Sequence, residues 1–117
     1  MSSIDACLDG LALINRRILE RSRQERERRI DERTVAVVVP DLDTTFRLRL
    51  TVEGLTDLTH HPTATAPGPA QVTVTVSGDD LVAIAEDRIS AKLALVTRRV
   101  KVDASLIDML RMRSLAR

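Results

Sequence analysis

The side chains that could do chemistry in this 117-residue chain are few and scattered. His60 and His61 are its only histidines, and no Cys or Glu at metal-ligand spacing accompanies them, so we interpret them as solvated loop residues. Ser77 and Ser105 lack a neighbouring His that could activate a nucleophile. The sequence therefore predicts no catalytic residue, no metal site and no cofactor, and it indicates that the protein is not an enzyme.

The single cysteine, Cys7, lies among apolar residues at helical spacing and has no partner for an intramolecular disulfide. We expect a buried, unreactive thiol. Asp5 and Asp9 interrupt the apolar residues near the N-terminus, where a secretory signal needs a continuous apolar run. No run approaches the roughly 20 apolar residues of a membrane-spanning helix. These features favour a cytoplasmic protein.

The composition narrows the range of partners. Phe46 is the only aromatic residue, so the core must be aliphatic, and the aromatic platforms on which single-stranded nucleic acids stack are missing. A net charge of +1 supplies no strong field toward a polyanion, and we predict no nucleic-acid partner. All but two of the 18 Lys and Arg residues are Arg, which is typical of a GC-rich bacterial genome.

The apolar spacing predicts the elements that would position any site. Apolar residues three and four apart predict helices, alternating or β-branched runs predict strands, and Ser-x-x-Asp patterns predict helix starts. The expected order is a helix over 3–30, strands at 34–39, 44–52, 55–60 and 71–76 with a loop over 61–70, helices over 77–87 and 90–96, a strand at 99–102 and a helix from Ser105. We therefore expect an α/β fold of the α+β type, whose mostly antiparallel five-stranded sheet is covered by helices. One domain is expected to span 1–117, with 1–33 as an N-terminal helix and charged extension and 34–117 as the body.

The segment from Arg16 to Arg33 carries eight arginines and five acidic residues. Such a helix could contact an anionic membrane surface or an acidic partner. Many of its Glu and Arg residues lie three or four apart, so we favour an exposed helix held by salt bridges. We expect at most a transient contact with a membrane surface.

Residues 71–115 read QVTVTVSGDDLVAIAEDRISAKLALVTRRVKVDASLIDMLRMRSL, which is an alternating strand, a capped Asp-Leu helix, a short helix, a strand and an amphipathic helix. In this order they resemble the sterol carrier protein type-two family in a stand-alone bacterial form. The preceding helix and strands extend the resemblance over nearly the whole chain. Two places depart from the family pattern, which usually has Gly where Asp87 or Arg88 stands and a Phe-x-Gly-like segment where this chain has Val96-Thr97-Arg98.

The resemblance implies a non-catalytic lipid-binding domain that holds a sterol, fatty acid, acyl-CoA or phospholipid in an apolar cavity between sheet and helices. Nine apolar side chains are candidates for the lining of that cavity: Phe46, Leu48, Leu50, Leu81, Ile84, Leu106, Met109, Leu110 and Met112. Arg113 lies near the middle of the apolar arc of the final helix and is a candidate contact for an anionic head group, with snorkelling at a helix end as the alternative.

The same apolar residues suit a closed core equally well, because amphipathic elements bury their apolar faces with or without a cavity. In that case the fold would be an interaction module that pairs with a second copy as a homodimer or with another protein. Both readings stay open on the sequence alone.

Overall fold

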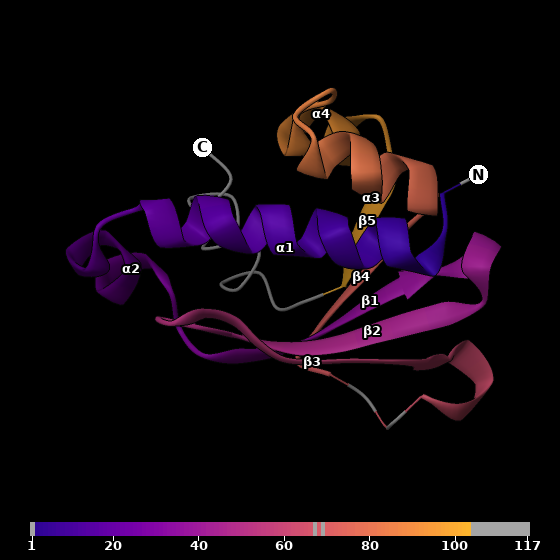
Figure 1. The fold of residues 1–117 in the computed structure, drawn as a ribbon, viewed down its shortest axis with the longest axis horizontal. Helices are drawn as coiled ribbons and strands as arrows, with labels where there is room; N and C mark the ends of the chain where they lie inside the picture. Colours follow the sequence, from indigo (N-terminus) through magenta and orange to yellow (C-terminus); the bar gives the residue numbers. More distant parts are fainter. Residues whose placement is uncertain (1, 67, 69, 104–117) are drawn as a thin grey trace.

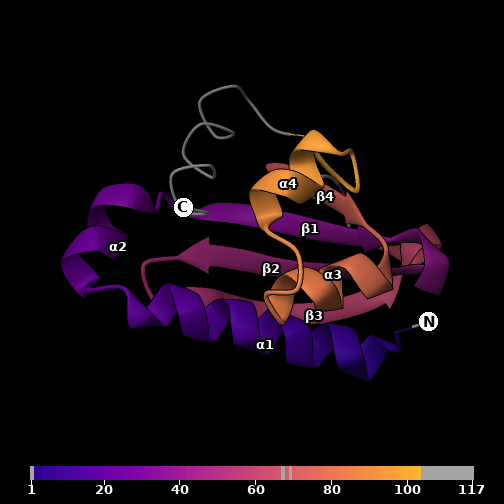
Figure 2. The same cartoon turned by 90° about the horizontal axis from the view of Figure 1, so that it is seen from above.

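Five strands and four α-helices make two layers in the part of the chain that the structure describes (Figure 1). The computed structural model describes residues 2–66, 68 and 70–103. In chain order the elements are α1 (Ile4–Glu20), α2 (Arg23–Arg29), β1 (Arg33–Val39), the 3-10 turn η1 (Pro40–Leu42), β2 (Thr44–Thr51), β3 (Gly54–Pro62), the 3-10 turn η2 (Thr63–Thr65), β4 (Val72–Val76), α3 (Gly78–Ala85), α4 (Ala91–Val96) and β5 (Val100–Asp103). Helices α1, α3 and α4 lie over the same face of the sheet, and α2 lies at one end of α1 (Figures 1 and 2).

The sheet has the strand order β3-β2-β1-β4-β5. The pairs β1–β2, β2–β3 and β4–β5 are antiparallel, whereas β1 and β4 run parallel, with Val35 opposite Val72 and Val37 opposite Val74. The first three strands form the expected meander, and β4 joins it on the other side of β1. The predicted α+β fold with a mostly antiparallel five-stranded sheet is confirmed.

The first helix is shorter than the sequence analysis predicted. α1 ends at Glu20, and the Ser22 hydroxyl accepts a hydrogen bond from the Glu25 amide at 3.2 Å, which starts α2 as a separate helix. The prediction of one continuous helix over 3–30 is therefore wrong. Arg26 stabilises the break, because its guanidinium donates to the backbone oxygens of Arg21 at 3.2 Å and Val52 at 2.7 Å.

The predicted loop over 61–70 begins too early, because β3 continues to Pro62. His61 is paired with Thr45 and Pro62 with Thr44. Proline is tolerated here because it closes an edge strand, where no further ladder hydrogen bond is needed. The predicted hairpin of β1 and β2 and the strands β4 and β5 agree with the structure to within one residue at each end, and the Ser77 and Ser90 helix caps are both formed. The final helix that is expected from Ser105 lies outside the described residues.

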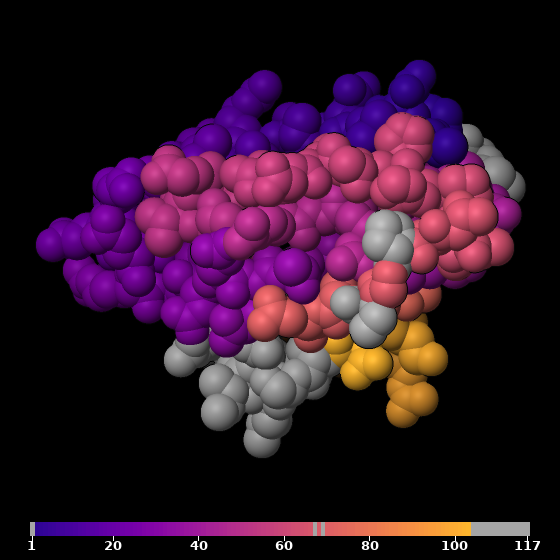
Figure 3. Space-filling view, turned by 90° about the horizontal axis from the view of Figure 1, so that it is seen from below, coloured from indigo at the N-terminus to yellow at the C-terminus, as the bar shows by residue number. Residues whose placement is uncertain are grey.

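The core lies between α1, α3 and the sheet face that they cover. Side chains alternate along each strand, and the register places Val37 beside Phe46 and Val74. The buried cluster contains Cys7, Leu11, Val35, Val37, Val39, Phe46, Leu48, Val72, Val76 and Leu81. Gly10 lets the two helices approach, since a Cβ there would lie 3.2 Å from the Ala85 Cβ. The sheet face under the helices is thus apolar and covered, while Thr73, Thr75 and Lys101 alternate with the valines and belong to the opposite face. Figure 3 shows the molecule from the side opposite the helices.

Helices α3 and α4 end in the same way. At the end of α3 the Arg88 amide donates to the Ala83 oxygen and the Asp87 amide to the Ile84 oxygen. Across the end of α4, the amides of Arg99 and Arg98 donate to the oxygens of Ala94 and Leu95 in the same pattern. This is the Schellman motif, whose left-handed residue is usually Gly. Here Asp87 at φ 63° and Arg98 at φ 61° occupy that conformation, in the two places where the chain departs from the family pattern.

Candidate functional site

The layer between the sheet and the helices is the candidate binding site, and three of its predicted residues are packed core. Phe46, Leu48 and Leu81 are 0%, 4% and 6% exposed and belong to one buried cluster. Phe46 lies opposite His60 of β3, whose ring is 6.0 Å away and tilted by 51°, so that the imidazole covers the edge of the core. These three side chains, two from β2 and one from α3, therefore belong to a closed core rather than to an open surface.

The margins of the same layer are only half-buried. Leu50 packs against the cluster and is paired with Leu55 of β3, at the end of β2 that lies near α2. Toward the opposite edge of the sheet, on the same face, Val74 is paired with Val102 of β5, and both side chains are half-buried. The apolar face thus continues beyond the closed core in both directions.

The remaining predicted site residues divide into two groups. Ile84 is half-buried and lies outside the core cluster, and its backbone oxygen accepts from the Arg17 guanidinium at 3.3 Å. Arg17 also donates to the Ala85 oxygen, so it caps the carbonyl end of α3. Leu106, Met109, Leu110, Met112 and Arg113 lie outside the described residues.

The valines of β1, β4 and β5 were not among the predicted lining residues, although they share the face. Val35 and Val37 of β1 lie in register with Val72 and Val74 of β4. The alternation of β4 indicated an inward face, but its place beside β1 depends on a parallel pairing that no local pattern reveals. Any ligand held in this layer meets these valines as well as Phe46 and Leu48.

The polar groups near the layer are used to fix its helices. The Asp41 carboxylate accepts from the Gly78 amide at 3.0 and 3.2 Å and joins the β1–β2 turn to the start of α3. Asp79 accepts from the Ser2 hydroxyl and amide at 2.8 and 2.7 Å, and these hydrogen bonds lower the pKa of the Asp79 carboxyl. Burial, together with the negative charges of Asp41 and Asp79, raises the pKa of the Cys7 thiol, which therefore stays protonated near neutral pH. The predicted buried thiol is confirmed.

Among residues 2–66, 68 and 70–103 there is no cluster of three or more His, Cys, Asp or Glu side chains that could hold a metal ion. The His61 ring lies 3.3 Å from the Thr59 hydroxyl. His61 is on the outer, polar face of the sheet, whereas His60 is on the face of Phe46. None of the helices in this part of the chain is long and apolar enough to cross a membrane.

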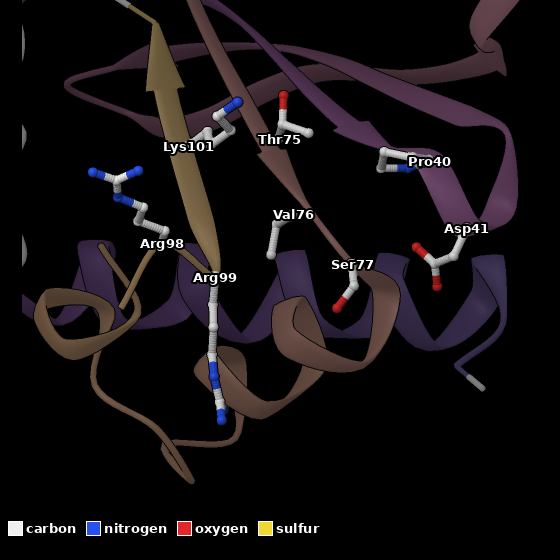
Figure 4. Close-up of a pocket in the computed structure, with 8 residues that line it drawn as sticks. All are labelled: Pro40, Asp41, Thr75, Val76, Ser77, Arg98, Arg99 and Lys101. Atoms are coloured by element: carbon white, nitrogen blue, oxygen red, sulfur yellow. The ribbon is translucent and has the colours of Figure 1, made fainter. Parts of the chain in front are cut away.

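A pocket of about 300 Å³ opens where β4 leads into α3, beside the first residues of β5 (Figure 4). Its lining consists of Pro40, Asp41, Thr75, Val76, Ser77, Arg98, Arg99 and Lys101. The Asp41 carboxylate is on the far side of the pocket from the cations and is already bonded to Gly78. Arg98, Arg99 and Lys101 point in three different directions and do not converge on one point. The pocket therefore lacks the convergent cationic geometry of a site for a single small anion.

Two arginines where α1 ends and α2 begins are paired with acids of the same region. Arg21 lies 3.6 Å from Glu25 and Arg23 3.0 Å from Glu27, in both cases one helical turn apart, and Arg23 also reaches Glu53 at 3.1 Å. Hydrogen bonding to Glu53 raises the pKa of the Arg23 guanidinium further. None of the residues of α2 is buried, so the predicted exposed, salt-bridged helix agrees with the structure.

Comparison with known proteins adds a family to this geometry. The profile described as the SCP-2 sterol transfer family matches residues 11–117. A comparison with curated protein sequences gives no match.

Three solved structures illustrate the likeness in fold. Palmitated SCP2L2 from Aedes aegypti has a TM-score of 0.64 and 13% identity, and the alignment covers 98% of this chain and 95% of that one. The UbiJ-SCP2 ubiquinone synthesis protein has a TM-score of 0.59 and 18% identity, with 99% and 93% covered. The sec-alkylsulfatase Pisa1 from Pseudomonas sp. has a TM-score of 0.53 and 22% identity over 75% of this chain, which spans only 14% of the sulfatase. At these identities the likeness shows the fold: an N-terminal helix and a five-stranded, mostly antiparallel sheet with helices on it.

Proposed function

The chain belongs to the SCP-2 sterol transfer family, a lipid-binding and lipid-transfer fold, and we propose that it binds one lipid molecule without catalysing a reaction on it. The observation that carries the proposal is the continuous apolar face of the sheet, which is closed at Phe46 and only half-buried at Leu50, Val74 and Val102. No buried side-chain nitrogen or oxygen among the described residues lacks a hydrogen-bond partner. Such a surface suits an acyl chain or sterol ring system, which offers no hydrogen bonds in return.

The proposed ligand lies against the half-buried margins, with the packed core as its floor. Phe46 and Leu48 of β2 and Leu81 of α3 belong to that core, whereas Leu50 and Ile84 are half-buried. From the sequence, the other wall is proposed to come from Leu106, Met109, Leu110 and Met112, with Arg113 as the contact for an anionic head group. This arrangement buries the apolar part of a lipid and leaves its polar end at the surface.

The energetics of such binding need no specific polar chemistry. Burying about 300 Å² of apolar surface is worth roughly 7–8 kcal/mol. Part of this is offset by the loss of translational and rotational freedom on association, which costs at least about 4 kcal/mol. The balance supports reversible binding, which is what a carrier requires because it must also release its ligand.

The ligand class is proposed as fatty acid, acyl-CoA, phospholipid or sterol. The Aedes aegypti protein was studied in palmitated form, which makes palmitate a sensible first ligand for a direct test. We place the function in the cytoplasm, with no catalytic step and no cofactor.

A homodimer is the second candidate function of this fold. Leu19 on α1 and Leu58 on β3 are 43% and 40% exposed, and paired copies could cover them. Light scattering distinguishes this reading, since a closed-core interaction module is expected to be a tight dimer that carries no lipid.

The first test is native mass spectrometry of the purified protein, followed by organic extraction of whatever it carries. We expect close to one equivalent of a fatty acid, sterol or phospholipid. An empty monomer that also fails to take up added palmitate contradicts the proposal, and an empty dimer supports the interaction module.

The second test locates the ligand. The chain has no Trp or Tyr, so a single introduced Trp is the only strong fluorophore. Val74→Trp and, separately, Leu50→Trp are expected to change their emission saturably as palmitate is added, because both side chains lie at the proposed site. Leu58→Trp on exposed β3 is the control and is expected to stay constant. Equal responses at all three positions would mean that the lipid binds elsewhere or nonspecifically.

A further inference from the structure

The segment from Arg88 to Lys101 carries five cations and no acidic residue. It contains all of α4 and the first two residues of β5, and it forms one edge of the molecule, where it projects beyond the sheet (Figures 2 and 3). The chain as a whole is nearly neutral, at a net charge of +1, so this stretch is a local concentration of positive charge.

Two large aliphatic side chains are exposed within this segment. Leu93 is 53% exposed and Val96 is 73% exposed, both on α4. Residues three apart in a helix lie on the same side, so the two side chains form one apolar spot. Ala94, in contrast, is completely buried, which fixes the orientation of α4 with its apolar spot outward.

Most of the cations around this spot have no counter-ion in the part of the chain that the structure describes. Lys92, Arg98 and Lys101 form no ion pair with any residue in the described ranges. Arg88 is paired with Glu86 at 2.7 Å, and Arg99 lies 3.9 Å from Asp80. Figure 4 shows Arg98, Arg99 and Lys101 spreading apart from the start of β5. Spread cations meet several anions that are distributed over a surface better than one anion in a pocket.

We propose that α4 and the start of β5 form a docking surface for an anionic lipid bilayer. Leu93 and Val96 enter the boundary between head groups and acyl chains, while Lys92, Arg98 and Lys101 contact lipid phosphates and carboxylates. Aliphatic side chains ringed by Lys and Arg are the pattern of helices that lie in a membrane interface. The biological role of this surface rests on the proposed function, because a lipid carrier must meet a bilayer to exchange its ligand, although docking itself needs no bound ligand.

A protein partner fits this surface less well than a bilayer does. Stable protein interfaces bury roughly 800 Å² on each side and are enriched in aromatic residues and Met at their centre. This surface offers one Leu and one Val, and the described part of the chain has its single Phe in the core. Long cations that point in different directions also lack the fixed geometry of an interface.

The surface is tested by cosedimentation of the full chain with large vesicles of phosphatidylcholine, with and without added phosphatidylserine. We expect binding to the anionic vesicles and a marked loss of binding at high salt, since screening weakens contacts between cations and lipid head groups. Each Lys or Arg near such a surface contributes about fivefold to the partition coefficient, so Lys92→Gln, Arg98→Gln and Lys101→Gln together are expected to weaken it about 100-fold. Leu93→Ser with Val96→Ser is expected to weaken it by about tenfold.

The matched control removes three exposed cations from the other Arg-rich region, as Arg16→Gln, Arg23→Gln and Arg28→Gln. Its partition coefficient is expected to stay within about twofold of the unaltered protein, because these residues lie outside the proposed surface. Circular dichroism verifies that each variant is folded, and because all the altered side chains are exposed or lie at helix ends, no loss of the core is expected. A control that loses binding as strongly as the α4 variants overturns the proposal.

Three further results would also overturn it: no binding of the unaltered protein to anionic vesicles, displacement from them by millimolar inorganic phosphate alone, or a dimer that Leu93→Ser with Val96→Ser dissociates. Failure of the proposed function is distinguishable, because lipid occupancy is measured separately by native mass spectrometry. A protein that carries no lipid but docks through α4 keeps the surface and loses the carrier. A protein that carries lipid but ignores anionic vesicles does the reverse.

Discussion

Two regions of this molecule are rich in basic residues, but they differ in how many of their cations are paired with acidic side chains. Where α1 ends and α2 begins, Glu25 and Glu27 lie one helical turn from Arg21 and Arg23 and pair with them. In the segment from Arg88 to Lys101 no acid is interleaved, and three of the five cations have no ion pair in the described ranges. Where the acids stand decides whether a basic stretch is available to a partner. The more basic-looking N-terminal segment is therefore the less available one.

The two regions also differ in how their backbone is stabilised. The start of α2 is fixed by the Ser22 cap and by Arg26, whose guanidinium ties α2 to the β2–β3 turn. The end of α4 places Arg98 in a left-handed conformation, which costs a residue with a side chain roughly 1–2 kcal/mol. Arg26 therefore stabilises the fold, whereas the conformation of Arg98 reduces its stability.

The largest expected effect comes from breaking the α2 anchor. Arg26→Met is expected to lower the free energy of unfolding by about 1.5–3 kcal/mol, since it removes two charged hydrogen bonds to backbone oxygens at a partly buried position. Urea denaturation measures the change. Arg28→Met on the same helix is the control and is expected to change stability by less than about 0.5 kcal/mol. Equal losses in the two variants would show that the charge of α2 matters and not the anchor.

A smaller effect of opposite sign is expected at the end of α4. Arg98→Gly removes the strain of the left-handed residue, and after the greater freedom of Gly in the unfolded chain is subtracted, a gain of about 0.5–1 kcal/mol remains. Lys92→Gly, in the first turn of α4, is the control and is expected to cost up to about 1 kcal/mol. Thermal denaturation of both variants gives the comparison, and a destabilised Arg98→Gly would mean that the Arg98 side chain makes a stabilising contact.

The smallest effect is expected from the exposed ion pair of Arg23 and Glu53. Glu53→Gln removes the partner that lies 3.1 Å from Arg23, yet both side chains are more than half exposed. Exposed pairs contribute little to stability, so we expect only a slight decrease in the free energy of unfolding, and the difference vanishes in concentrated salt. Urea denaturation at low and high salt tests this. A loss of unfolding free energy as large as that of Arg26→Met would show that α2 is held in place mainly by its ion pairs.

Much of the fold was predictable because it follows local rules. The period-two pattern of β2 placed Phe46 and Leu48 on the inner face, and the Ser-x-x-Asp pattern located the start of α3. The break after α1 was also readable, since Ser22 and Glu25 form a capping-box pattern, but the helical run on either side of it obscured this signal. Parallel pairing of β1 with β4 was not readable, because it depends on contacts between distant segments.

The candidate site was predictable only in part. On α3 the sequence favoured Leu81 and Ile84, and the structure buries Leu81 with Ala85, which follows one turn later and contacts α1 at Gly10. The basic surface at α4 was not predicted, although the sequence from Arg88 to Lys101 contains five cations and no acidic residue. A cation's freedom depends on which distant acids reach it, as Asp80 reaches Arg99, and that is set by the tertiary structure.

The parallel register of β1 and β4 has a kinetic consequence. β1 meets β2 across a short turn, whereas it meets β4 only after a loop of 37 residues has closed, as between Thr34 and Gln71. Long closures are slower than local hairpins, so the meander of β1 to β3 is expected to assemble first, and β4, α3, α4 and β5 to dock onto it afterwards. In the native state the same elements are expected to be the unit that opens most readily. Val74 and Val102 belong to that unit, so their amide hydrogens are expected to exchange sooner than those of β2. A transient opening of this half of the molecule would let an apolar ligand enter and leave.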